Sequence, residues 1–130
     1  MENGRNKILV ADDEEPIRII SNEILHENFP QFEVELFENG VSLENRLKKG
    51  VNDVKLIITD NQMPGGVWGS EIILKYAKRP EYSDVRFIFS YGGDDRLGPA
   101  AVEAGAFDYI KKPVPGEVYV DAVRKALGLQ

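Results

Sequence analysis

Five short apolar runs, each followed by a segment of helical periodicity, alternate along almost the whole of this 130-residue chain. The apolar runs occupy residues 7–11, 32–37, 54–60, 85–90 and 107–111. Between the runs, apolar residues recur at helical spacing, as Ile17, Ile20 and Ile24 do after the first run. Strict alternation of strands and helices is typical of a parallel sheet with helices on both faces. The sequence therefore predicts an α/β fold with a single doubly wound, five-stranded parallel sheet and five helices.

The length is that of one domain, so we expect a single domain over residues 1–130 with its core at about residues 7–127. One segment of this domain is ambiguous. The alternation requires a helix in residues 94–105, but Gly98-Pro99 interrupts it. A proline inside a helix removes a hydrogen bond and clashes with the preceding turn, at a cost of ~3 kcal/mol. The fourth helix therefore begins near Pro99 or is broken there.

Composition excludes several kinds of site and partner. The sequence has no cysteine and one histidine, which excludes disulfides and thiolate metal sites and argues against a zinc site. The formal net charge of -6 argues against direct binding of nucleic acid, which needs a basic face. The N-terminus lacks the apolar core of a secretion signal, and no apolar run approaches the roughly 20 residues of a membrane helix. These features are typical of a soluble cytoplasmic protein without membrane contact.

Four of the apolar runs end at polar groups that can bind phosphate or metal. Asp12 and Asp13 follow the first run, Asp60 ends the third, Ser90 ends the fourth, and Lys112 follows the fifth. In an open parallel sheet of order 2-1-3-4-5, ligands bind beyond the carboxyl ends of the strands, where the strand order reverses. We therefore expect these side chains to lie close together. Three carboxylates in one place repel each other unless a cation compensates, and Mg²⁺ prefers such oxygen ligands.

In these features the sequence resembles the response-regulator receiver domains, the CheY-like family of two-component signalling, whose fold is flavodoxin-like. The motifs that carry the resemblance are Asp12-Asp13, Asp60 with Met63-Pro64-Gly65, Ser90, Ala104-Gly105-Ala106, and Tyr109 with Lys112-Pro113. They span roughly residues 7–127. Each motif alone is weak, but their order and their places at the strand ends make the resemblance specific.

The resemblance implies a role for each matching residue. Asp60 would be the phosphoacceptor, which takes a phosphoryl group from the phosphohistidine of a histidine kinase. Asp13 and Asp60 would bind Mg²⁺ directly, and Asp12 would act mainly through water. The backbone carbonyl of Gln62 would complete the protein ligands of the ion.

The resemblance also implies how a signal would enter and leave. Ser90 and Lys112 would each bind a phosphoryl oxygen. Tyr109 would be an aromatic switch that turns inward when Ser90 moves toward the phosphate. Output would run through the face of the fourth helix, fifth strand and fifth helix, which could also form a homodimer. The upstream partner would be a sensor histidine kinase or a phosphotransfer protein.

Three features depart from the pattern of the family. Tyr91 follows Ser90 directly, where a small residue is usual, and we expect it to act as a gate that slows access of the phosphodonor. The glycine that usually follows the Met-Pro segment comes one residue late, as Gly69, which indicates an insertion in the preceding loop. Gly98-Pro99 disturbs the fourth helix.

Two other functions fit the same residues. One is a phosphorylation-independent, receiver-like binding module in which Tyr91 blocks the site. The other is a Mg²⁺-dependent phosphohydrolase with Asp60 as its nucleophile. The phosphohydrolase is the weaker alternative, because such enzymes usually carry a second carboxylate two residues after the nucleophile, where this chain has Gln62. The chain could be a free-standing regulator or part of a longer regulator or hybrid kinase.

Overall fold

The computed structural model describes residues 4–129, and within them the five expected strands form one parallel sheet. The strands are β1 (Lys7–Ala11), β2 (Glu33–Phe37), β3 (Val54–Asp60), β4 (Arg86–Tyr91) and β5 (Asp108–Lys111). Their order in the sheet is β2-β1-β3-β4-β5, which confirms the predicted fold class and strand order. Adjacent strands pair so that Ala11 lies beside Thr59, and Asp60 lies beside Ser90.

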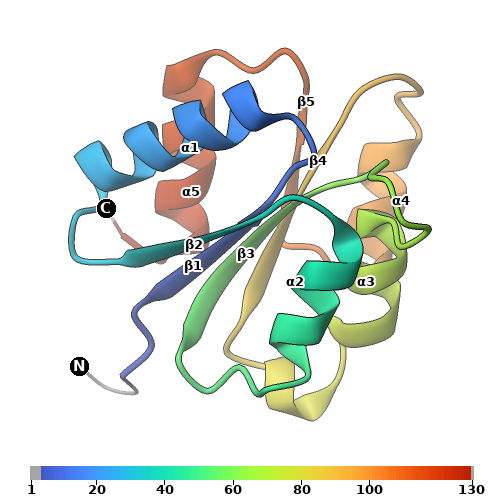
Figure 1. The fold of residues 1–130 in the computed structure, drawn as a ribbon, viewed down its shortest axis with the longest axis horizontal. Coiled ribbons are helices and arrows are strands. Elements are labelled where there is room, and N and C mark those ends of the chain that lie inside the picture. The colour runs from blue at the N-terminus through green and yellow to red at the C-terminus, as the bar shows by residue number, and fades with distance from the viewer. Residues whose placement is uncertain (1–3, 130) are drawn as a thin grey trace.

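Helices cover both faces of this sheet (Figure 1). They are α1 (Glu15–Asn28), α2 (Gly40–Leu47), α3 (Gly69–Tyr76), α4 (Leu97–Ala104) and α5 (Gly116–Ala126), with a short 3₁₀ turn η1 (Pro80–Tyr82) before β4. α1 and α5 lie on one face, and α2, α3 and α4 lie on the other. No helix within residues 4–129 is long and apolar enough to cross a membrane.

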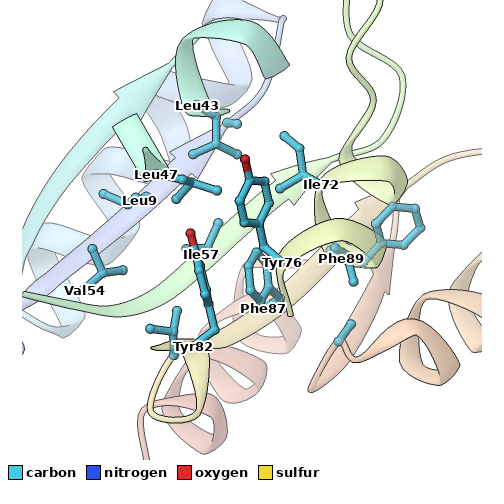
Figure 2. Packing of buried hydrophobic residues seen from close by; sticks show 14 of the residues in the cluster. Leu9, Leu43, Leu47, Val54, Ile57, Ile72, Tyr76, Tyr82, Phe87 and Phe89 are labelled. Atoms are coloured by element: carbon cyan, nitrogen blue, oxygen red, sulfur yellow. The ribbon is translucent and has the colours of Figure 1, made fainter. Parts of the chain in front are cut away.

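The core has two halves because successive side chains of a strand point to opposite faces of the sheet. In β4, Phe87 and Phe89 pack beneath α2, α3 and α4, whereas Ile88 between them packs beneath α1 and α5. In β3, Ile57 and Ile58 divide in the same way. Figure 2 shows the first of these halves, in which side chains of α2 and α3 lie against those of the sheet. The same alternation decides which polar residues can meet at the strand ends.

Of the two alternatives for the fourth helix, the structure shows the first, because α4 begins at Leu97, near Pro99. Pro99 stands in the first turn, where a proline is tolerated because the first N–H groups of a helix have no acceptor within the helix. Gly98 has a different role. A Cβ at Gly98 would lie 2.4 Å from Cδ1 of Tyr109, so the tyrosine ring of β5 packs directly on the helix backbone. The Gly98-Pro99 pair thus starts α4 and lets it approach β5 closely.

The loop from β3 to α3 returns very close to the end of β3. Gly69, the first residue of α3, donates its N–H to the carbonyl of Asn61 at 2.8 Å. A Cβ at Gly69 would lie 2.0 Å from the carbonyl oxygen of Asp60. Gly65 and Gly66 have φ angles of 96° and 85°, in the left-handed region that glycine adopts readily. These glycines let the loop fold tightly against the phosphoacceptor predicted at the end of β3.

We predict that Gly69→Ala destabilises the fold by about 2 kcal/mol or more, since the new methyl group meets backbone that cannot move aside. Gly116→Ala is the matched control, because Gly116 also begins a helix and a Cβ there meets nothing within 4 Å. Gly116→Ala should leave the free energy of unfolding unchanged or raise it, because alanine favours the helical conformation more than glycine does. Urea unfolding followed by circular dichroism measures both variants. Equal stability of the two would contradict the close approach of Gly69 to Asp60.

Candidate functional site

Four polar residues meet at the carboxyl edge of the sheet because their side chains point to the same face. Asp12, Asp60, Ser90 and Lys112 each stand two positions after an apolar residue that packs beneath α1 and α5. Those residues are Val10, Ile58, Ile88 and Ile110. The sheet hydrogen bonding extends to Asp12 and Lys112, whose N–H groups donate to carbonyls of neighbouring strands at 3.0 and 2.7 Å. All four polar residues line one cavity of about 500 Å³.

The predicted acidic cluster is present at this edge. Carboxylate oxygens of Asp12, Asp13 and Asp60 lie within 4.8 Å of one another. Asp12 and Asp60 are buried, whereas Asp13 is exposed, so the cluster opens to solvent on the side of Asp13. Carboxylates at this spacing fit one Mg²⁺ ion, which would offset their repulsion. Gln62 lines a cavity with Asp13 and Asp60, and the ligand role expected of its backbone carbonyl stays a prediction.

Lys112 lies between the two buried carboxylates. Its Nζ donates a hydrogen bond to Oδ2 of Asp12 at 2.8 Å and lies 3.3 Å from Oδ1 of Asp60. Burial alone would lower the pKa of Lys112, but the hydrogen bond to Asp12 and the charges of both carboxylates outweigh burial and raise the pKa. Lys112 is therefore protonated near neutral pH, and it supplies the positive charge that a phosphoryl group at this edge would need.

The fold opposes ionisation of Asp60. Burial, followed by the negative charge of Asp12, raises the pKa of the Asp60 carboxyl to about 6. Lys112 and the N–H of Asn61 act in the opposite direction and reduce the rise. Near neutral pH the Asp60 carboxylate is thus ionised but incompletely compensated. Such a group is suited to bind a cation or to act as a nucleophile.

Two residues, Asn61 and Arg18, make supporting contacts that are not evident from the sequence. Asn61 donates its N–H to Oδ1 of Asp60 at 2.9 Å, and its own side-chain oxygen accepts the N–H of Ser70 at 3.1 Å. Arg18 of α1 donates to the backbone carbonyl of Asp12 at 2.7 Å. These contacts fix the two buried aspartates to α3 and α1. An asparagine after a strand is a weak signal because asparagine is common in turns, and the Arg18 contact depends on how α1 packs.

Tyr91 lies on the opposite face of the sheet from Ser90, because the two residues are adjacent in β4. Its ring is 2% exposed and stacks on Phe89, with 5.5 Å between the ring centroids. In the described part of the chain, Tyr91 lines neither of the two cavities that contain Asp60. This position gives no support to the gate expected of Tyr91, which stays a prediction.

Tyr109 is the partly exposed neighbour of Tyr91. Its exposed fraction is 39%, and its ring centroid lies 6.1 Å from that of Tyr91. On its other side the ring packs on Gly98 of α4. Tyr109 thus lies between Tyr91 and α4, and its switch role stays a prediction.

A second cavity, of about 670 Å³, reaches Asp60 from the side of the loops. Its lining includes Asp13, Asp60 and Lys112. Trp68, to which the sequence motifs assign no role, also lines this cavity. The sequence places Trp68 in a glycine-rich loop, but only the folded loop brings it next to the cluster.

Comparison with known proteins agrees with this geometry. The family model of the response regulator receiver domain matches residues 8–124. A chemotaxis protein CheY homologue of Campylobacter jejuni is 33% identical over 125 residues, which cover 94% of this chain and 92% of that protein. Sporulation initiation phosphotransferase F of Bacillus subtilis is 31% identical over 125 residues, or 95% of each chain.

Solved structures share the fold. The crystal structure of a response regulator receiver domain protein from Clostridium thermocellum superposes with a TM-score of 0.82 and 27% identity. The superposition covers 95% of this chain and 94% of that chain. Some curated relatives are much longer, and the match spans 28% and 15% of the length of two of them.

We predict that Asp60→Asn stabilises the metal-free protein near neutral pH. The folded-state pKa of about 6 lies above the ordinary value of 3.8, so ionisation of Asp60 costs stability as the pH rises through this interval. Asparagine removes a cost of at most about 3 kcal/mol, which is the value of roughly two pKa units. Urea unfolding in chelator at about pH 4 and about pH 7.5 should show a larger advantage for the variant at the higher pH. An advantage that does not change with pH would contradict the raised pKa.

Proposed function

The chain belongs to the response regulator receiver domain family, and from that premise we propose that Asp60 is its phosphoacceptor. The chain is a receiver domain of two-component signalling. The phosphoryl group comes from the phosphohistidine of a sensor histidine kinase or a phosphotransfer protein, in a reaction that requires Mg²⁺. The observation that carries this proposal is the meeting of Asp60, Asp12 and Lys112 at one edge of the sheet, with Asp13 at its solvent side.

In this proposal an oxygen of Asp60 attacks phosphorus in line with the leaving nitrogen, so that a P–O bond forms as the P–N bond breaks. Lys112 pairs with one phosphoryl oxygen, and the hydroxyl of Ser90 donates to another. A bound Mg²⁺ would neutralise charge on the phosphoryl oxygens. Its expected ligands are Asp13, Asp60 and the backbone carbonyl of Gln62, with Asp12 acting mainly through water.

The relatives support a signalling role over metabolic catalysis. One is a sporulation initiation phosphotransferase and another is a chemotaxis protein, and each match covers more than nine tenths of the relative. We infer that this chain likewise passes on a signal, and that its own catalysis is limited to its phosphorylation and dephosphorylation. The blocked-module alternative depends on Tyr91, which lies on the other face of the sheet. The phosphohydrolase alternative lacks a second carboxylate at Gln62.

We expect acetyl phosphate with Mg²⁺ to add one phosphoryl group to the protein and chelator to prevent the addition. Asp60→Asn should abolish the modification. Asp121→Asn is the control, because Asp121 is an exposed carboxylate on α5 that lies outside the site, and it should be modified like the parent. Intact-protein mass spectrometry measures the added phosphoryl group in the parent and in both variants. Modification of Asp60→Asn at the parental rate would refute the assignment.

We further propose that output leaves through the face formed by α4, β5 and α5. Ser90 is joined in β4 to Tyr91, the ring of Tyr91 contacts that of Tyr109, and Tyr109 packs on Gly98 of α4. A shift of Ser90 toward the phosphate would therefore disturb a continuous row of contacts from the site to α4. Such a row provides the two-state element that allostery requires. The same face is our candidate surface for an output partner or a second copy of the chain.

Beryllofluoride, a mimic of the phosphoryl group, should change amide hydrogen exchange most between Tyr91 and Lys112. The physical reason is that this segment contains the tyrosine pair and the whole of α4. Hydrogen-exchange mass spectrometry of the parent measures the effect, and Asp60→Asn treated in the same way is the control. A change confined to the segments around Asp12 and Asp60 would show that no signal leaves the site.

A further inference from the structure

Trp68 is an exposed aromatic residue that lines the second, loop-side cavity together with Asp60. It is the one tryptophan of the sequence, and it is 41% exposed, although large aromatic side chains gain stability from burial. Pro64 and Leu97 are further apolar residues in the lining of the same cavity. Exposed aromatic side chains beside a functional pocket are frequent anchors for ligands and partners. Trp68 therefore belongs to the cavity through which a ligand can approach Asp60.

The backbone of Trp68 is fixed by contacts on both sides. Its N–H donates to Oε1 of Glu71 at 2.7 Å, and its carbonyl accepts the N–H of Ile72 at 3.2 Å. The carbonyl of the preceding Val67 lies so close to Gly40 of α2 that a Cβ there would approach it to 2.1 Å. The following residue, Gly69, lies against Asp60. The backbone that carries the ring is therefore already ordered before a ligand binds, which lowers the entropic cost of binding.

Lys112 of this lining is paired with Asp12 and Asp60, and the exposed carboxylates at the other side of the cavity favour a positively charged ligand next to the phosphoryl group. Asp13 and Glu14 are exposed carboxylates in the same lining as Trp68. The face of an indole also attracts cations, and tryptophan does so more strongly than the other aromatic residues. An N-phosphorylated imidazole has a planar ring that is cationic when its second nitrogen is protonated. The leaving group of acetyl phosphate is a small carboxylate with neither property.

We propose that Trp68 forms a subsite for the leaving group of the phosphodonor and selects a planar, cationic ring. The inference rests on the proposed role of Asp60 and adds a residue that distinguishes one donor from another. In an in-line transfer the leaving group stands on the far side of phosphorus from Asp60, toward the open part of the cavity. As the P–N bond breaks, its electron pair stays on the ring nitrogen, and the protonated ring leaves as neutral imidazole. Trp68 contacts this ring and takes no part in bond making.

The test compares two small donors, phosphoimidazole and acetyl phosphate, with the full chain and saturating Mg²⁺. The quantity measured is the phosphorylation rate constant with phosphoimidazole divided by that with acetyl phosphate. General effects of a substitution on Asp60 cancel in this ratio. In Trp68→Ala the ratio should fall about fivefold, the size expected for loss of one partly exposed cation–π contact. Trp68→Phe keeps an aromatic face and should recover most of the ratio. Leu74→Ala is the control, because Leu74 is a 73% exposed residue of α3 outside both cavities that contain Asp60.

A ratio in Trp68→Ala equal to that of the parent overturns the subsite while leaving Asp60 as phosphoacceptor. The same holds if Trp68→Phe and Trp68→Ala lower the ratio equally, since the aromatic face would then be irrelevant. A parent that neither donor modifies overturns the proposed function and the subsite with it. A selective fall in Trp68→Ala that Trp68→Phe restores supports the subsite.

Discussion

The alternation of side chains along paired parallel strands is the constraint on which the rest of the structure depends. Parallel pairing aligns the carboxyl ends of the strands, and the two-residue period sends every second side chain to the same face. Asp12, Asp60 and Lys112 meet because all three follow this rule on the face beneath α1 and α5. Tyr91 and Tyr109 follow it on the other face, so the site and the aromatic pair are separated by the thickness of the sheet.

Bringing these groups together creates an electrostatic cost that one lysine does not remove. Lys112 serves two buried carboxylates, and the pKa of Asp60 stays raised to about 6 despite that contact. Burial supplies the larger part of the rise, and Asp12 adds to it. A bound cation would relieve part of this cost. The metal-free protein is thus less stable than it would be with uncharged side chains at these positions. Such a cost is typical of sites that bind charged ligands.

Much of this arrangement could be predicted from the sequence. The fold and strand order follow from the alternation of apolar runs and helical segments, and the acidic cluster follows from residues at the strand ends. The position of Tyr91 could also have been predicted, since a residue adjacent to Ser90 in a strand must point to the other face. The place of Trp68 could not, because it depends on two loop glycines with positive φ and on the close contact at Gly69. Local patterns do not determine where such a loop folds back.

The central claim is that the carboxyl edge of the sheet gathers Asp12, Asp13 and Asp60 to hold a divalent cation beside a phosphoryl group. The most direct measurement is the melting temperature of the protein in chelator and in saturating Mg²⁺. A ligand that binds only the folded state at a hundred times its dissociation constant stabilises it by about 2.7 kcal/mol, so the melting temperature should rise by several degrees. Asp13→Asn should lose most of that rise. An identical melting temperature of the parent in chelator and in Mg²⁺ would contradict the account.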